Sequence, residues 1–340
     1  MRQEDQGEVA MGEPLLKVEN LHTYFHTVDG VVKAVRGVSF EVPEESVIGI
    51  VGESGSGKTV TGLSIMGLVP KPGKVEEGSI AFSGRNLLEL SEAEMRPMRG
   101  KEIAMVFQDA SSALNPVITI GEQIQEVLQV HTDLSMKRST DVTVELMTQM
   151  GIANGRQMLD RHPWEISGGM AQRVMLAMGL ALSPKLLVAD EPTSNLDVTV
   201  QAEILHRLNE HRRETGSSVI LITHDLGVMA QMADRVIVMY GGYKLEEADT
   251  LTLYDRPMHP YTNGLLDAVP RFDRPVKRLT PIRGVLPSAL DAPDRCPFLD
   301  RCDRALSVCR TGPMPDLEDP EPGHRVACYN PIPAGVRRSG

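Results

Sequence analysis

The chain has 340 residues, of which 41% are hydrophobic and 24% are charged, as in an ordinary soluble globular protein. Its formal net charge of −11 argues against a nucleic-acid partner, because nucleic-acid interfaces are usually basic. Its longest uncharged apolar runs, such as 174–182, fall well short of the roughly 18 residues that a membrane-spanning helix needs.

The chain opens with a polar, acidic stretch over residues 1–13, which predicts a disordered leader. It lacks the basic and apolar regions of a signal peptide, so we expect a cytoplasmic protein whose thiols stay reduced. Five later segments are short, mostly apolar runs that predict buried parallel strands: 47–52, 102–108, 185–192, 217–225 and 235–240. Helical patterns such as 198–216 lie between them. The sequence therefore predicts an α/β domain over residues 14–254, with a parallel sheet covered on both faces.

The segment GESGSGKT, residues 52–59, matches G-x-x-x-x-G-K-[ST] and lies between the first predicted strand and a helix that starts near Lys58. Its glycines let backbone N–H groups turn toward phosphate oxygens, and the helix N-terminus adds positive potential. Lys58 would reach the β- and γ-phosphates, and the Thr59 hydroxyl would bind Mg²⁺. A glycine-rich turn without a ligand is the alternative, but the strand–loop–helix context favours a nucleotide. The predicted phosphate-binding residues are Gly52, Ser54, Gly55, Ser56, Gly57, Lys58 and Thr59, and Val60 has no assigned role.

The stretch 119–183 interrupts the alternation of strands and helices, because its apolar residues recur at three- and four-residue spacing. We expect a helical insertion over about 110–180. Near its end, Ser167, Gly168 and Gly169 stand at the start of a predicted helix, where two glycines lower helix stability. Bare backbone N–H groups must therefore be needed there, and we predict a second anion-binding site at this helix N-terminus.

Four polar residues lie at the C-terminal ends of predicted strands, the edge at which open α/β sheets bind ligands. Asp190 suits a Mg²⁺ ligand, and Glu191 beside it suits a general base that polarises the attacking water. His224 is placed to contact a γ-phosphate, and Gln108 to contribute to Mg²⁺ binding and catalysis; with Lys58 they form the predicted catalytic group. The alternative is that each residue has only a structural role. Considered alone, the acidic pair could simply end a strand, and the histidine and the glutamine could be ordinary structural residues. The phosphate-binding loop favours the functional interpretation of all four.

The composition changes over residues 255–340, where 14 of the 23 prolines predict loops and short strands. All four cysteines lie in this extension, spaced C-x₅-C-x₆-C-x₁₈-C, at Cys296, Cys302, Cys309 and Cys328. The tight pairs of a zinc knuckle are missing, disulfides are disfavoured in a reducing cytoplasm, and four unrelated buried thiols are the plain alternative. A proline-rich extension with little apolar content needs a cross-link to stabilise its fold, and a metal group can provide one. We therefore expect a [4Fe–4S] cluster here or, as second choice, Zn²⁺.

The order of these motifs resembles the ATP-binding cassette subunits of ABC transporters, and the resemblance covers residues 15–333. In that family the Ser-Gly-Gly signature binds the γ-phosphate of ATP held by a partner subunit. The resemblance implies a P-loop NTPase fold with a RecA-like parallel sheet, an antiparallel β part and a helical subdomain, and Mg²⁺-dependent ATP hydrolysis. It also implies that Phe25, chosen over Tyr24, stacks on adenine, and that Asp197 in the segment 194–197 couples the two sites of a dimer.

Segments 107–116, 166–175 and 259–270, followed by the cysteine-bearing tail, look like the oligopeptide, dipeptide and nickel importers of bacteria. Such importers use two different ATPases, two membrane permeases and an extracytoplasmic binding protein, with the permeases docked on the helical insertion at about 110–165. The resemblance implies a peripheral subunit at the cytoplasmic face of the inner membrane that powers peptide uptake. Members of this branch also carry a [4Fe–4S] cluster at the matching cysteines.

Three residues depart from the family pattern: Met170 replaces the usual signature glutamine, Asn195 a small residue, and Glu45 a turn glycine. A non-transport ABC ATPase is one alternative, but such chains usually carry tandem cassettes, a coiled-coil insertion or basic surfaces. A regulatory cassette that binds ATP without hydrolysing it is another, and the presence of Glu191 and His224 argues against it. A homodimer is the alternative to a pair of different cassettes.

Overall fold

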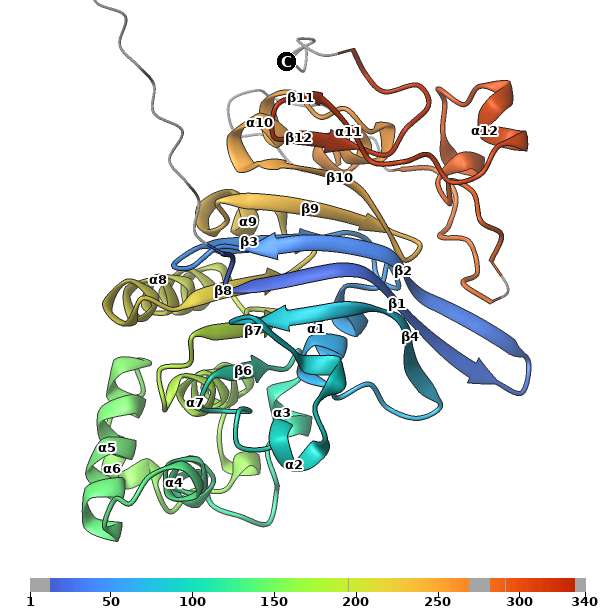
Figure 1. Cartoon of the computed structure of the whole chain (residues 1–340). Helices are drawn as coiled ribbons and strands as arrows, with labels where there is room; N and C mark the ends of the chain where they lie inside the picture. Colours follow the sequence, from blue (N-terminus) through green and yellow to red (C-terminus); the bar gives the residue numbers. More distant parts are fainter. Residues whose placement is uncertain (1–12, 195, 269–281, 291, 334–340) are drawn as a thin grey trace, which may run out of the picture.

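The computed structural model describes residues 13–194, 196–268, 282–290 and 292–333. The predicted leader lies outside this part of the chain except for its last residue, and so does Asn195. The described residues form two β-sheets with helices around them (Figure 1). The strands are β1 (Leu16–Thr27), β2 (Gly30–Val42), β3 (Val47–Val51), β4 (Gly73–Phe82), β5 (Arg85–Asn86), β6 (Ile103–Val106), β7 (Leu186–Asp190), β8 (Ser218–Ile222), β9 (Arg235–Tyr240), β10 (Tyr243–Asp249), β11 (Glu318–Glu321) and β12 (His324–Val326). The α-helices are α1 (Lys58–Met66), α2 (Glu92–Met95), α3 (Ala110–Ala113), α4 (Ile120–His131), α5 (Met136–Gln149), α6 (Gly155–Met158), α7 (Gly168–Leu180), α8 (Val198–Thr215), α9 (Leu226–Met232), α10 (Thr250–Asp255), α11 (Pro260–Asp267) and α12 (Ser307–Thr311).

Among the described residues, the larger sheet has eight strands in the order β11-β12-β10-β9-β3-β8-β7-β6. Strands β9, β3, β8, β7 and β6 run parallel to one another, and they are the five strands that the sequence predicts. Several predicted ranges run too far at their C-terminal ends, because the polar residues that follow each apolar run leave the ladder. Those polar residues therefore collect at one edge of the sheet.

The core lies on both faces of the larger sheet, because alternate residues of a strand point to opposite sides. In β3, Val47 and Val51 belong to the cluster that includes residues of α7, α8 and α9. Ile48 and Ile50 belong to the cluster on the other face, with α1 and the smaller sheet. The smaller sheet is antiparallel, in the order β2-β1-β4-β5. The predicted α/β architecture with an antiparallel part is confirmed.

The regular structure from Ala110 to Leu180, a stretch that is described throughout, consists of helices. These helices lie together at one end of the molecule, below the sheets in Figure 1. Helix α4 starts at a capping box, in which the Thr119 and Glu122 side chains bond each other's backbone N–H groups. Helix α7 packs against both α4 and β6, so it links the helical part to the sheet. Of the helices that the structure describes, none has the length and apolar character to cross a membrane.

The C-terminal extension is joined to the larger sheet, since β12 pairs with β10 and β11 pairs with β12, both antiparallel. A fully buried carboxylate holds this junction: Glu246 on β10 accepts hydrogen bonds from the backbone N–H groups of Met258 (2.6 Å) and His259 (2.9 Å). It also accepts one from the ring of His324 at 2.7 Å. Because a buried carboxylate is costly unless its partners are in place, these bonds tie the extension to the cassette.

The turn before β3 explains one departure from the family pattern. Glu45 has a φ of 54°, in the left-handed region that glycine adopts at the lowest cost. Its carbonyl oxygen accepts a hydrogen bond from Arg212 at 2.6 Å, which fixes the turn against α8. The backbone geometry that the family usually meets with a glycine is therefore present here with a glutamate.

Candidate nucleotide-binding site

A cavity of about 1000 Å³ lies where the loop after β3 faces the β1–β2 hairpin. Five separate segments of the sequence contribute predicted residues to its wall, namely Phe25, Ser54, Gly55, Ser56, Gly57, Lys58, Thr59, Gln108, Glu191 and His224. Its volume reaches the upper end of the range typical of ligand pockets. The fold thus brings most of the predicted site residues around one space that is large enough for a nucleotide.

The predicted phosphate-binding loop connects β3 to α1. Gly57 precedes the helix with a φ of 103°, and a Cβ atom there would lie 2.4 Å from the carbonyl oxygen of Ala34, so the position requires glycine. Lys58 is 7% exposed, and its ammonium donates hydrogen bonds to the carbonyl oxygens of Gly52 (2.7 Å) and Glu53 (3.0 Å). Burial lowers the pKa of this lysine. The loop therefore holds a cation and a set of backbone N–H groups at the floor of the cavity.

The opposite wall comes from the hairpin, through Phe25 and Thr27 of β1 and Val32 and Ala34 of β2. Neighbouring residues of a strand point to opposite sides, and Tyr24 contributes nothing to the cavity wall. Its hydroxyl group instead bonds the ring of His22 at 2.9 Å. Of the two aromatic residues, Phe25 therefore lines the cavity and Tyr24 does not.

Asp190 ends β7 and is 1% exposed. Its Oδ1 atom has no hydrogen-bond partner among the described residues, and the Thr59 side chain bonds the same carboxylate. Burial raises the pKa of Asp190 to about 6. A buried carboxylate oxygen without a partner, next to a threonine hydroxyl, fits the oxygen ligands that Mg²⁺ takes beside bound phosphates. Gln108, the third predicted Mg²⁺ ligand, lies exposed beyond β6 at the rim of the cavity.

Replacing Asp190 by asparagine should stabilise the protein when nucleotide and Mg²⁺ are absent. Because the pKa of this group is raised from 3.8 to about 6 on folding, the folded chain binds the proton more tightly, and its stability falls as pH rises through this range. Asp190→Asn removes that loss, so its advantage should approach about 3 kcal/mol at pH 8 and be smaller at pH 5. Urea unfolding measures it, with the exposed Asp133→Asn as the control. Equal stability of variant and parent at pH 8 would contradict the prediction.

Glu191 and His224 form a hydrogen-bonded pair at the cavity. Glu191 has a φ of 49°, and its backbone N–H donates to the carbonyl of Ile222 at 2.8 Å, which turns the side chain toward the end of β8. Its Oε1 atom accepts from the backbone N–H of His224 at 3.1 Å and from the ring Nδ1 at 2.7 Å. Because an ionised carboxylate can only accept, this histidine must carry a proton on Nδ1. The Thr223 hydroxyl donates to Oε2 at 3.3 Å, so hydrogen bonds hold both oxygens of the carboxylate.

The signature residues and Asp197 do not line this cavity. Ser167 caps α7, and its hydroxyl accepts a hydrogen bond from the N–H of Met170 at 3.3 Å. A Cβ atom on Gly168 would meet nothing within 4 Å, so no contact within the described chain requires glycine there, and Gly169 follows it in the first turn. The Asp197 carboxylate caps α8. These residues therefore contribute nothing to the wall of this cavity.

Sequence reasoning missed one wall of the cavity, which Leu286, Pro287 and Ala289 of the C-terminal extension supply. The backbone N–H of Lys33 donates to the carbonyl of Ala289 at 3.1 Å, and this bond ties the segment to β2. These residues are apolar positions in a proline-rich stretch that is far from the phosphate-binding loop in sequence. No sequence motif and no helical or strand periodicity indicates that they belong to the site. Val32 and Ala34, in contrast, alternate along β2, so a strand pattern could have indicated them.

The predicted [4Fe–4S] cluster is wrong, and Zn²⁺ at the same cysteines has no support. Among the described residues, no group of three or more His, Cys, Asp or Glu side chains is arranged to hold a metal ion. The four free cysteines line a cavity of only about 20 Å³, which has room for about one water molecule. Burial raises the pKa of Cys296 to about 12 and that of Cys328 to about 11. These two thiols are protonated at neutral pH.

Three family models match parts of the chain, among them one described as "AAA domain, putative AbiEii toxin, Type IV TA system" over residues 160–230. Residues 35–194 match the model described as "ABC transporter", and residues 245–309 match "Oligopeptide/dipeptide transporter, C-terminal region". The chain is 47% identical to a probable peptide ABC transporter ATP-binding protein of Sinorhizobium fredii, over 93% of this chain and 94% of that protein. It is 48% identical to a dipeptide transport ATP-binding protein of Bacillus subtilis, over 93% of this chain and 95% of that protein. It is 43% identical to an oligopeptide transport ATP-binding protein of Escherichia coli, over 94% of each chain.

Solved structures give the same fold. An ATP-binding cassette solved as a dimer in a post-hydrolysis state, bound to ADP and Pi, aligns with a TM-score of 0.64 at 26% identity, over 69% of this chain and 98% of that one. The fold is that of a P-loop NTPase cassette, and the chain belongs to the family of ATP-binding subunits of oligopeptide and dipeptide ABC transporters.

Proposed function

We propose that this chain hydrolyses MgATP to power the import of peptides through a membrane transporter, as a peripheral subunit on the cytoplasmic side of the membrane. One observation carries the proposal: the phosphate-binding loop, the Glu191–His224 pair and Phe25 all line one cavity. A loop alone indicates only a phosphate ligand, whereas a fixed carboxylate beside it adds a group that can activate water. The family supports the choice of peptides as the transported solute, because the relatives are named as peptide transport subunits.

The predicted site residues have distinct roles in this proposal. The backbone N–H groups of residues 52–59 and the Lys58 ammonium bind the β- and γ-phosphates, and Phe25 stacks on the adenine. Thr59, Asp190 and Gln108 hold Mg²⁺, which supplies positive charge beside the phosphates when it is bound.

The hydrolytic step falls to Glu191, which takes a proton from the attacking water. His224 holds this carboxylate through the 2.7 Å bond and also reaches toward the γ-phosphate. The histidine is thus a positioning residue for the base as well as a phosphate contact. A cassette that only binds ATP as a regulatory clamp would have no need of such a fixed carboxylate.

The signature residues imply a second cassette. Ser167 and Gly168 are exposed at the start of α7, away from the chain's own cavity, and the bare position 168 leaves room for a close approach. In this proposal they bind the γ-phosphate held by a head-to-tail partner, and Asp197 contacts the partner at the neighbouring edge. The solved relative is itself a dimer, which supports a composite site. We propose that the partner is a second, different cassette chain.

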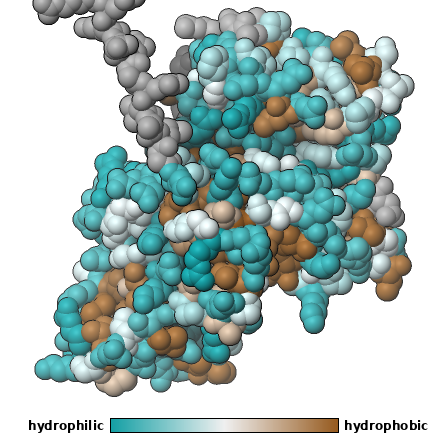
Figure 2. Space-filling model, viewed as in Figure 1, coloured by the Kyte–Doolittle hydropathy of each residue, from teal (hydrophilic) through white to brown (hydrophobic). Residues whose placement is uncertain are grey.

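The helical part, about 110–165, is the proposed docking surface for two permeases, which work with an extracytoplasmic binding protein. An apolar cavity of about 270 Å³ lies between this part and the sheet, lined by Leu68, Phe107, Val127 and Met178 among others. Figure 2 shows further hydrophobic side chains exposed over the lower, helical end of the molecule. An exposed apolar surface of this kind is typical of a protein interaction site.

Proteoliposomes test the proposal. Vesicles that contain the permeases, the second cassette and the binding protein should take up a labelled dipeptide only when this chain and ATP are present. Gly168→Arg should abolish uptake while ATP binding at residues 52–59 persists, because a long side chain would block the partner's phosphate. Leu251→Arg, an exposed position on α10 outside the helical part and outside the nucleotide cavity, should behave as the parent. Full transport by this chain without a second ATPase would contradict the heteromeric arrangement, and no ATP-dependent uptake by the complete set would contradict the function.

A further inference from the structure

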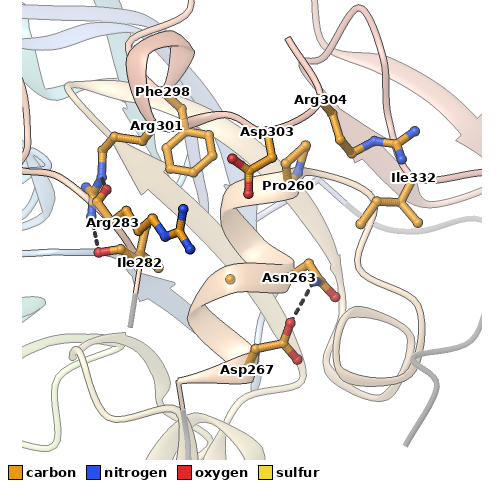
Figure 3. Close-up of a pocket in the computed structure, with 11 residues that line it drawn as sticks. Pro260, Asn263, Asp267, Ile282, Arg283, Phe298, Arg301, Asp303, Arg304 and Ile332 are labelled. Atoms are coloured by element: carbon orange, nitrogen blue, oxygen red, sulfur yellow. Dashed lines mark hydrogen bonds between the residues drawn. The ribbon is translucent and has the colours of Figure 1, made fainter. Parts of the chain in front are cut away.

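The C-terminal extension contains a cavity of about 370 Å³ that takes no part in the nucleotide site. Figure 3 shows it between α11 and the two segments that carry Ile282–Arg283 and Phe298–Arg304. Its volume lies within the range of small-molecule sites. Nothing in the proposed ATP chemistry uses this space.

Charges of both signs point into this cavity. Figure 3 shows the Arg283 guanidinium and the Asp303 carboxylate directed into the same space. Neither side chain makes a hydrogen bond or an ion pair with any residue that the structure describes. Arg304 at the rim is held by the carbonyl oxygen of Pro331 and by Asn330, so no carboxylate neutralises its charge. The cavity therefore offers an unpaired cation and an unpaired anion to a ligand.

The remaining wall has an apolar part, formed by Pro260, Ile282, Phe298 and Ile332, and a polar part in which the Asn263 amide donates to the Asp267 carboxylate at 2.8 Å. Phe298 is almost fully buried, so its ring is a fixed surface for a hydrocarbon group. A ligand that fits must carry a negative group, a positive group and an apolar part within a small volume. Zwitterionic α-amino acids and short peptides combine these three features.

We propose that this cavity binds a small zwitterion, a short peptide or an amino acid, and that its occupancy is transmitted to the phosphate-binding loop. The ligand carboxylate pairs with Arg283, its ammonium pairs with Asp303, and its side chain packs on Phe298. Charge-assisted hydrogen bonds of this kind are the stronger class of polar contact. The proposal rests on the proposed function only in naming peptides as one source of the ligand.

One side chain connects the cavity to the nucleotide site. Arg301 lines the cavity, is 7% exposed, and donates to the Glu53 carboxylate of the phosphate-binding loop at 2.8 Å. Its Nε atom donates to the carbonyl oxygen of Arg283 at 2.7 Å, so the residue that meets the ligand's carboxylate also holds Arg301. The loop is held a second time, since the N–H of Glu53 donates to the Tyr261 hydroxyl at 2.8 Å. A ligand that moves Arg283 therefore moves a contact of the loop.

Binding at the two sites must then be reciprocal. If the zwitterion changes the affinity of the loop for ATP by some factor, ATP changes the affinity for the zwitterion by the same factor. For an importer this arrangement would make the ATPase respond to the concentration of imported product on the cytoplasmic side.

Calorimetry on the purified, nucleotide-free chain tests the site. Alanyl-phenylalanine and free phenylalanine are the probes, and N-acetyl-alanyl-phenylalanine amide, which lacks both charges, is the matched control ligand. We expect saturable binding of one probe per chain and none of the control. Tighter binding of the dipeptide identifies a peptide as the ligand, and tighter binding of phenylalanine identifies an amino acid. Arg283→Gln and Asp303→Asn should each weaken binding by about tenfold or more, because each leaves one charge of the ligand unpaired.

Arg310→Gln, an exposed arginine of the same extension outside the cavity, should bind as the parent. Arg301→Lys should abolish the mutual effect of zwitterion and ATP, because lysine cannot hold Glu53 and the Arg283 carbonyl together. Absence of binding of either probe up to about 10 mM, or binding unchanged in Arg283→Gln and Asp303→Asn, would overturn the site. Equal ATP affinity with and without a bound probe would overturn the coupling. None of these measurements depends on transport. Zwitterion binding can therefore be absent while ATP-driven peptide uptake is observed, and peptide uptake can be absent while zwitterion binding is observed.

Discussion

Glu191→Gln is expected to keep ATP binding and lose turnover by about 10²-fold or more, roughly the contribution of a positioned general base. The amide has the shape of the carboxylate: its oxygen can still accept the hydrogen bonds from His224, and its NH₂ group can donate to the Thr223 hydroxyl, so the cavity should keep its form. It cannot take a proton from water at neutral pH. The effect should therefore fall on the hydrolytic rate and leave the nucleotide affinity near that of the parent.

Single-turnover hydrolysis and equilibrium binding of a fluorescent ATP analogue separate these two quantities. Glu126→Gln is the control, since Glu126 is exposed on α4 and lies outside the cavity. If Glu191→Gln hydrolyses ATP at the parent rate, the base lies elsewhere and the proposed mechanism is wrong. If the parent itself binds ATP and fails to hydrolyse it even in the assembled transporter, the regulatory-clamp alternative replaces the proposal.

Lys58→Met is expected to weaken ATP binding by roughly 10²-fold, which corresponds to about 3 kcal/mol. The ammonium is the one basic side chain among the described residues that line the nucleotide cavity, apart from His224, so nothing nearby replaces its charge. Methionine keeps the length and the packing of the lysine stem. The loss should therefore be electrostatic and should not arise from a collapsed loop.

Thermal unfolding distinguishes the two causes. Burial lowers the pKa of Lys58, which means that the folded chain pays a desolvation cost to keep the ammonium inside. Methionine removes this cost, so the nucleotide-free variant should unfold at the same temperature as the parent or above it. The exposed Lys101→Met serves as the control for a change of net charge. Parent-like ATP affinity in Lys58→Met would show that the phosphates bind elsewhere.

Local patterns predicted the parts of the site that depend on neighbours in sequence. The buried strands are continuous apolar runs, the phosphate-binding loop is one motif, and Glu191 and His224 follow strand ends, so parallel pairing brings them to the same edge. The sequence could not predict contacts that depend on tertiary packing between distant segments. Examples are the bond from Arg301 to Glu53 and the wall formed by Leu286.

For the cysteines, the sequence predicted a metal group that the structure does not support. Their clustering in the sequence suggested a shared ligand, and they do meet around one cavity. Clustering, however, contains no information on how far burial favours the protonated thiol or on how much space remains between the sulfur atoms. Both depend on the packed structure, in which no group of described side chains is arranged to hold a metal ion.

The strand order of the larger sheet has a consequence for synthesis of the chain on the ribosome. Strand β3 has β8 and β9 as its neighbours in the sheet, so it stays unpaired until the residues from Ser218 onward have been made. The outer edge of β10 then stays open until β12, which ends at Val326, has emerged. Unpaired strand edges in a nascent chain are sites of aggregation. A chain whose translation stops before β12 therefore keeps an exposed edge, and we expect such truncated products to depend on chaperones or to aggregate.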